Sequence, residues 1–195
     1  MSEQNPSTNV SGPNQIDYKS IFEDIKKDPT LLSTLDINAL LRTIPDDRVD
    51  YLNTKTLNDV GLDVLESFDH FVGSPYVVPG LISEFCHKLI GYRFVDEIYK
   101  LHKGKHVRWV RFSPNDNHHI NAINITTTPY LSLTNGGIVV DIKFLDDGVH
   151  ILCKNNMNRF IQYRFDDCLT YQKLSYEEQL VLMVNEQINR VTPFK

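Results

Sequence analysis

The sequence lacks three features that would each assign the protein to a particular class. None of its apolar runs approaches the roughly 18 to 20 residues that a membrane-spanning helix needs. Its start has no basic region followed by an apolar one, so we expect no secretory signal. It has only 3 cysteines, at unrelated spacings, whereas a disulfide framework uses a denser and even set. These absences predict a non-membrane protein of a reducing, intracellular compartment, with its cysteines present as buried thiols.

Local signatures of catalysis, metal binding and phosphate binding are missing as well. The sequence has no Gly-x-Ser-x-Gly nucleophile motif and no Gly-x-x-x-x-Gly-Lys phosphate loop. His118 and His119 are adjacent, so on a strand they would point to opposite faces, and Cys86 with His87 does not have the spacing of a ligand pair. We therefore predict no cofactor, no metal and no enzymatic activity. An enzyme whose site is assembled from scattered residues stays an alternative.

The chain does have the composition of a globular protein and an uneven distribution of charge. Apolar residues make up 41% and charged residues 23%, which is typical of one folded core. The net charge of −5 divides into −8 for residues 1–85, +5 for residues 86–112 and −2 for residues 113–195. An acidic chain has no general attraction for nucleic acid, so such binding would be local to the basic segment. Alternatively, the acidic first part folds against that segment.

The sequence of the first half of the chain predicts a tail followed by helices. Residues 1–16 are polar and rich in Ser, Asn and Pro, which is typical of a disordered tail. Residues 17–103 form a helical region, because their apolar positions recur at helical spacing. The predicted helices are 17–28 with Asp17 as N-cap, 31–44 with a break near Asp36, 56–71, and 80–101 with Gly91 as its weak point.

The apolar period changes from 3.6 to 2 near Lys103 and Gly104, which predicts that strands begin there. Residues 104–174 alternate in short runs joined by polar turns, and Gly136-Gly137 is one of the predicted hairpin turns. The predicted strands are 106–112, 120–128, 130–133, 138–144, 149–153, 161–165 and 169–171. We expect an antiparallel meander that curls into a small SH3-like or Tudor-like barrel, or a strongly bent sheet.

The chain ends in a predicted helix that completes an α+β fold. Ser175 and Glu178 match a capping box, which predicts a helix over 175–191 that packs on the barrel or closes its open end. The phase of the strands also predicts a shared core. Its expected members are Trp109, Val140, Ile142, Phe144, Ile151, Ile161, Tyr163 and Phe165. If this core is packed, Phe144→Ala costs about 3–5 kcal/mol.

One basic aromatic segment is the candidate binding site. The only Trp of the chain lies between two arginines, and two lysines precede them. The candidate residues are Lys103, Lys105, Arg108, Trp109 and Arg111. Cations beside an aromatic face suit a phosphate backbone with stacked bases, or an acidic protein partner. The alternative is that Trp109 belongs to the core and that the arginines are solvated or paired with carboxylates.

Part of the sequence resembles a viral family. The segments that carry the resemblance are 89–110, 133–142, 153–156 and 172–174. They look similar to segments of uncharacterised small proteins of giant nucleocytoplasmic DNA viruses, and the resemblance spans about residues 88–191. It implies a virion protein or DNA-associated protein located in the host cytoplasm or in the virion. No functional residues are carried over.

Three functions follow as hypotheses. The first is a non-enzymatic interaction module that binds a protein or nucleic acid through the basic aromatic segment. The second is a structural component of a viral or other assembly, which would show itself by self-association. The third is the enzyme, which a cavity with convergent histidine and carboxylate groups would favour.

Overall fold

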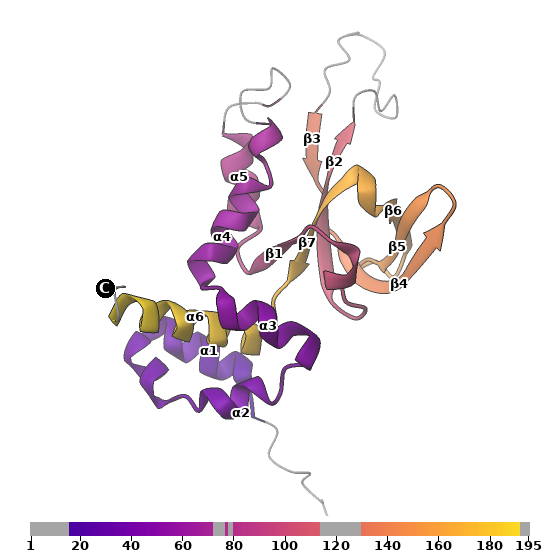
Figure 1. The fold of residues 1–195 in the computed structure, drawn as a ribbon. Helices are drawn as coiled ribbons and strands as arrows, with labels where there is room; N and C mark the ends of the chain where they lie inside the picture. The colour runs from indigo at the N-terminus through magenta and orange to yellow at the C-terminus, as the bar shows by residue number, and fades with distance from the viewer. Residues whose placement is uncertain (1–15, 72–76, 78–79, 114–129, 192–195) are drawn as a thin grey trace, which may run out of the picture.

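The computed structural model describes residues 16–71, 77, 80–113 and 130–191. Three of the sequence predictions therefore fall outside the described residues: nearly all of the tail 1–16, the strand 120–128, and the pair His118 and His119. The described residues form an α+β fold in which a helical layer and a sheet lie side by side (Figure 1).

The helices of the first half largely follow the predicted ones, because polar caps set their starts. Asp17 accepts hydrogen bonds from two backbone N–H groups of α1. Asp36 caps α2, and Thr56 forms a capping box with Asp59 at the start of α4. The break predicted near Asp36 is confirmed, whereas the third helix α3 was not predicted. The segments are α1 Tyr18–Lys27, η1 Pro29–Thr34, α2 Ile37–Leu41, α3 Asp46–Thr54, α4 Leu57–Glu66, η2 Asp69–Phe71 and α5 Leu81–Lys88.

The long helix predicted over 80–101 is wrong. It ends at Lys88, and Gly91 then adopts a left-handed φ of 80°, which a glycine accepts without the steric cost of a Cβ. The sheet therefore begins earlier than the predicted change at Lys103. Strand β1, Tyr92–Val95, follows Gly91 directly, and a short 3₁₀ helix, η3, covers Ile98–Lys100.

The sheet has seven strands, all paired antiparallel, and it is open. Its order is β1-β7-β2-β4-β5-β6, with β3 paired to β2, and no ladder joins β1 to β6 among the described residues. The antiparallel sheet is confirmed, but the SH3-like barrel is not, because the sheet does not close. It bends strongly, since Trp109 of β2 stacks on Tyr163 of β6 with ring centroids 4.2 Å apart. The remaining strands are β2 His106–Ser113, β3 Tyr130–Leu133, β4 Gly137–Leu145, β5 Gly148–Lys154, β6 Phe160–Arg164 and β7 Cys168–Lys173.

The predicted hairpin turn at Gly136-Gly137 is wrong, because β3 and β4 run in the same direction along one edge of β2. The chain bends between them, and Thr134 replaces the missing ladder contacts: its Oγ1 accepts from the Trp109 N–H and donates to the Trp109 carbonyl. At the bend a Cβ on Gly136 would lie 1.9 Å from the Val107 carbonyl oxygen. This close approach, together with a φ of 78°, requires glycine at 136.

A β-bulge changes the phase of β4 and corrects the predicted core. The register against β5 shifts between Val139 and Asp141, so Val139 is buried and Val140 is 43% exposed. Phe144 is 72% exposed, because β4 extends past the edge of the core. Both residues were wrongly assigned to the core. Trp109, Ile151 and Tyr163 are buried together as predicted, with Ile142, Ile161 and Phe165 partly buried against them.

The C-terminal helix α6, Tyr176–Val191, begins with the predicted capping box. Its buried residues Leu180, Val181 and Val184 pack with Phe22 and other residues of the helical layer. Helix α6 contacts α1, α2, α3 and α4 and lies across them in Figure 1. The prediction that it packs on a barrel is corrected accordingly. The acidic first part provides the face that an amphipathic helix of this kind must bury.

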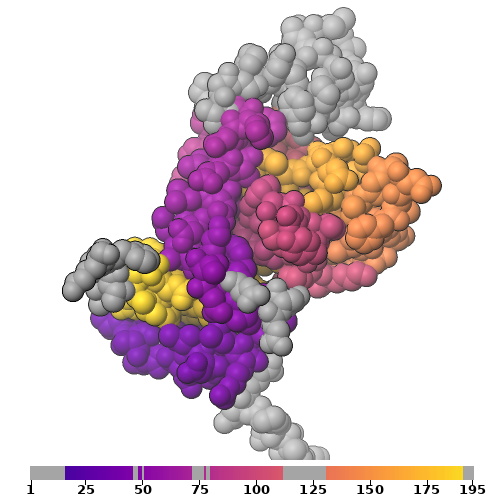
Figure 2. All heavy atoms as spheres, viewed as in Figure 1, coloured from indigo at the N-terminus to yellow at the C-terminus, as the bar shows by residue number. Residues whose placement is uncertain are grey.

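Helices α4 and α5 cover one face of the sheet. Phe68, at the end of α4, stacks on Tyr171 of β7, and its ring lies 5.8 Å from the tyrosine ring. The opposite, concave face holds the cluster around Trp109. In Figure 2 the helical layer and the β4–β6 meander lie at opposite ends of the molecule. The junction between helical layer and sheet is formed by α3, β1, η3 and the start of α6.

Candidate functional site

Each predicted cation of the basic aromatic segment has a partner within the protein. The Lys103 Nζ lies 2.6 Å from the Asp141 carboxylate, and the Lys105 Nζ lies 3.2 Å from that of Glu178. Arg108 donates to two backbone carbonyl oxygens, of Thr134 at 2.8 Å and of Lys88 at 2.7 Å.

The structure does not bring these residues to one surface. Trp109 is 1% exposed and stacked on Tyr163, so no base can stack on it. Arg111 lies over the Trp109 ring, 5.8 Å from its centre. Because side chains alternate along a strand, Arg108 lies on the face of the sheet opposite to that of Arg111. Of the five candidates, only Lys105 reaches a group of charged side chains that lines a cavity.

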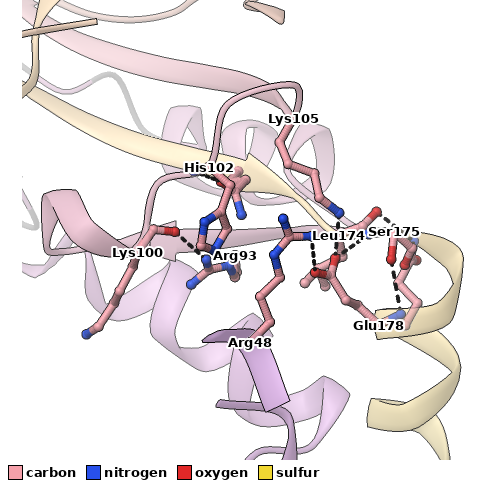
Figure 3. A network of polar contacts seen from close by, with 10 residues as sticks. Arg48, Arg93, Lys100, His102, Lys105, Leu174, Ser175 and Glu178 are labelled. Carbon is pink, nitrogen blue, oxygen red and sulfur yellow. Dashed lines mark hydrogen bonds and ion pairs between the residues drawn. The ribbon is translucent and has the colours of Figure 1, made fainter. Parts of the chain in front are cut away.

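That cavity lies at the junction and has a volume of about 310 Å³. Three residues of α3, one of β1, three near η3 and two near the start of α6 line it. They are Arg48, Tyr51, Leu52, Arg93, Tyr99, Lys100, His102, Leu174 and Glu178. Figure 3 shows Arg48, Arg93 and Lys105 reaching toward this region from three different elements.

Glu178 is the buried carboxylate of the site, with 3% exposure. It accepts hydrogen bonds from the Ser175 N–H at 2.5 Å, the Lys105 Nζ at 3.2 Å and the Arg48 Nη1 at 3.4 Å. Burial by itself raises the pKa of Glu178, but the Ser175 N–H and the two cations outweigh burial, so the pKa is lowered. Glu178 is therefore held ionised, and its oxygens are occupied by internal donors.

Arg93 is the unusual residue of the site. It is 6% exposed, its Nη2 donates to the Lys100 carbonyl oxygen at 2.5 Å, and its guanidinium lies over the Tyr51 ring, 5.0 Å from its centre. Among the described side chains, no carboxylate lies within ion-pair distance of it. Burial lowers the pKa of Arg93, and nearby Arg48 lowers it further, against the opposing effects of Tyr51, Glu178 and Asp96. A buried charge in a protein is normally paired, so this one requires an explanation.

Tyr51 lines the same cavity beside Arg93. Its hydroxyl is enclosed by protein and has no hydrogen-bond partner within the described part of the chain. Burial raises the pKa of this hydroxyl, so it stays protonated and can donate. Among the described residues, a donor without an acceptor therefore adjoins a cation that no carboxylate contacts directly.

Arg93 also borders a second cavity of about 560 Å³, on the side of α4. Two of the carboxylates that line it are already paired with lysines. Asp63 lies 2.7 Å from the Lys55 Nζ, and Asp96 lies 2.9 Å from the Lys100 Nζ. Glu66 is a third carboxylate that lines this cavity, so its described lining carries no excess of positive charge.

Sequence reasoning missed this site because its residues come from distant segments. Arg93 lay in the wrongly predicted helix, and Arg48 lay in a helix that was not predicted. Glu178 was recognised only as a capping residue. The alternation in Tyr92–Val95 is the one sequence pattern that could have indicated the site. It places Arg93 on the same face as Val95, so the arginine side chain is directed into the protein.

The described residues contain no group of three or more His, Cys, Asp and Glu side chains that could hold a metal ion. None of the described helices combines the length and apolarity needed to cross a membrane. The three cysteines are not disulfide-bonded. Burial raises the pKa of Cys153 to about 12 and that of Cys168 to about 11, so neither is an activated thiolate.

Comparison with family models, with curated proteins and with solved structures found no match to this chain. The resemblance to proteins of giant viruses therefore stays a prediction, and the chemistry of the site has to be inferred from its own geometry.

Proposed function

We propose that the protein is a non-enzymatic binding module that takes a small anionic ligand, through a phosphate or carboxylate group, in the cavity beside Arg93. The observation that carries the proposal is the buried guanidinium of Arg93, which has no carboxylate partner among the described side chains and lines a cavity. Arginine presents its donors in a planar fork that matches the oxygens of both groups.

The charges around the cavity favour an anion. Arg48, Arg93 and Lys100 line the cavity, and Glu178 is the one carboxylate among its described lining residues. Glu178 accepts from Arg48 and Lys105, and no carboxylate among the described side chains lies within ion-pair distance of Arg93. An anion bound there would supply the missing counter-charge and an acceptor for the Tyr51 hydroxyl.

The size of the cavity favours a small ligand over a polymer. A volume of about 310 Å³ is at the lower end of the range for small-molecule sites, which is roughly 300–1,000 Å³. Nucleic acid at the basic aromatic segment is the less favoured binding function, because its cations have internal partners and Trp109 is buried.

The site also favours binding over catalysis. His102 and Glu178 both line the cavity, which is the combination of groups expected of an enzyme. A general acid or base, however, needs a pKa near the working pH, whereas the pKa of Glu178 is lowered and its oxygens accept three hydrogen bonds.

The test is ligand-dependent thermal stability. Sodium phosphate, pyrophosphate and citrate are each titrated at constant ionic strength set with sodium chloride. A ligand that binds only the folded state raises Tm, by about 2–4 °C for each kcal/mol of binding free energy in a chain of this size. We expect at least one of these anions to raise Tm and to give saturable heat in calorimetry.

Three variants make the test specific to Arg93. Arg93→Met should abolish the response to the anion, while stability without anion stays equal or increases, because an unpaired buried charge has been removed. Arg93→Lys keeps the charge but loses the fork, so it should retain a weaker response. Arg111→Met is the matched control at an exposed arginine outside the cavity and should respond as the wild type does.

The competing explanation is an internal counter-charge, since α3 also carries Asp46, Asp47 and Asp50, whose side chains lie outside the described set. It predicts that none of the three anions changes Tm and that Arg93→Met destabilises the free protein. Either result contradicts the proposal.

A further inference from the structure

The edge strand β6 and the exposed residues beside it form a second unusual region. Six of the thirteen large apolar side chains that are exposed among the described residues belong to the β4–β6 meander. They are Ile138, Val140, Phe144, Leu145, Met157 and Phe160. Met157 is 70% and Phe160 is 63% exposed. Phe160 lies in β6 itself and Met157 in the turn before it, so the edge strand presents apolar area to solvent.

The edge strands β1 and β6 differ in how they are covered. Helix α4 packs along β1, whereas β6 makes extensive contact only with β5 in the part of the chain that the structure describes. Edge strands in natural proteins are usually shielded by a helix, a proline or a bulge. Strand β6, with the sequence Phe-Ile-Gln-Tyr-Arg, has none of these. No hydrogen bond to another described residue occupies its outer backbone groups.

The hydrogen bonds of the β5–β6 hairpin show which groups these are. The Asn155 N–H donates to the Arg159 carbonyl oxygen at 2.9 Å. Hydrogen-bonded pairs recur every second residue along an antiparallel ladder. Residues 161 and 163 therefore face β5, and the N–H and carbonyl groups of Phe160, Gln162 and Arg164 point to the open edge.

The charges along the meander are arranged in a self-complementary way. Lys154 and Arg159 lie at the end where β5 turns into β6, and neither forms an ion pair with another described residue. Asp166 and Asp167 lie at the other end of β6, close to the Asp146-Asp147 turn. Two copies that meet with β6 antiparallel to β6 place the basic end of each beside the acidic end of the other.

We infer that β6 is the interface of a symmetric dimer, in which β6 of a second copy pairs antiparallel with it about Gln162. This register joins the outward backbone groups of Phe160, Gln162 and Arg164 into one ladder. It places Phe160 opposite Arg164 of the second copy, a favourable contact between a cation and an aromatic ring. The same patch meets itself across a two-fold axis, which is the commonest symmetry of soluble oligomers. In Figure 2 the meander projects away from the helical layer.

The test is the mass in solution of the full chain as a function of concentration, measured by sedimentation equilibrium. The wild-type mass should rise from 22.5 kDa toward twice that value as the concentration increases. Gln162→Pro removes an outward N–H and the side-chain contact with His150, but no backbone hydrogen bond of the ladder to β5, so the edge is blocked while that ladder is preserved. This variant should remain monomeric, with an unchanged circular dichroism spectrum. Gln162→Thr keeps the N–H and is the matched control, which should dimerise.

A charge exchange tests the orientation of the two strands. Arg159→Glu and Asp166→Lys should each weaken dimerisation by at least about tenfold, because each places like charges together. The double variant should regain the wild-type affinity. A wild-type chain that stays at 22.5 kDa at every concentration overturns the inference. So does a Gln162→Pro variant that is folded and dimerises normally, or a double variant weaker than both single ones.

Discussion

The junction and the β4–β6 meander depart from the usual pattern of a globular protein in opposite directions. The junction buries charge, with Arg93 at 6% and Glu178 at 3% exposure, whereas the meander exposes large apolar groups such as Phe144. Each departure costs stability in the isolated chain. The difference suggests two kinds of partner: an anion for the first region, and an apolar and hydrogen-bonding surface for the second.

The largest expected effect tests whether the junction depends on its single buried carboxylate. Glu178→Gln removes the carboxylate that Arg48 and Lys105 both contact. Breaking a buried ion pair in this way costs about 3–5 kcal/mol, which chemical denaturation can measure. Glu177→Gln changes the neighbouring position, which forms no ion pair with another described residue, and should cost much less. Equal losses in the two variants would show that the network around Glu178 is not specific.

A smaller effect should appear in the pH dependence of stability. The pKa of Glu178 is lowered below its ordinary value of 4.5, so its ionised form contributes to folding. The contribution is fully present above the pKa of the unfolded chain and is lost as the pH falls through the lower pKa of the folded state. Stability curves from neutral pH down to acid pH should therefore fall more steeply for the wild type than for Glu178→Gln. Parallel curves would contradict the assignment.

The smallest effect is expected at the meander. Phe144→Ala should change the free energy of unfolding by less than about 1 kcal/mol, since the side chain is mostly solvated. Phe68→Ala is the matched change at a fully buried phenylalanine and should cost about 3–5 kcal/mol. Both are best measured in the Gln162→Pro background, so that self-association adds nothing. Similar losses at the two positions would mean that the end of β4 is packed.

Local signals predicted some parts of this fold well. The starts of α1, α4 and α6 were readable because Asp17, Thr56 and Ser175 cap their own helices within a few residues. The strands of the meander were readable because alternation is a property of each strand alone. The dense core around Trp109 was foreseen in part, whereas the bulge after Val139 was not, because it arises from pairing with a second strand.

The candidate site was hardly predictable. Lys105 was singled out for its sequence neighbours, but its partner Glu178 lies 73 residues away. Arg93 was assigned to a helix that Gly91 ends. No local pattern shows that Arg48, Arg93 and Glu178 come together, because the spacing between them along the chain has no periodicity.

The sequence by itself determined the α+β class, the caps of the helices and the alternation of the strands, because these depend on interactions between residues that are close along the chain. The tertiary structure decided that the sheet stays open, that α6 packs on the N-terminal helices, and that the cations of the basic segment separate. It also decided that the buried guanidinium of Arg93 has no carboxylate partner among the described side chains. Burial and pairing depend on which distant segments meet, and only the packed chain determines that.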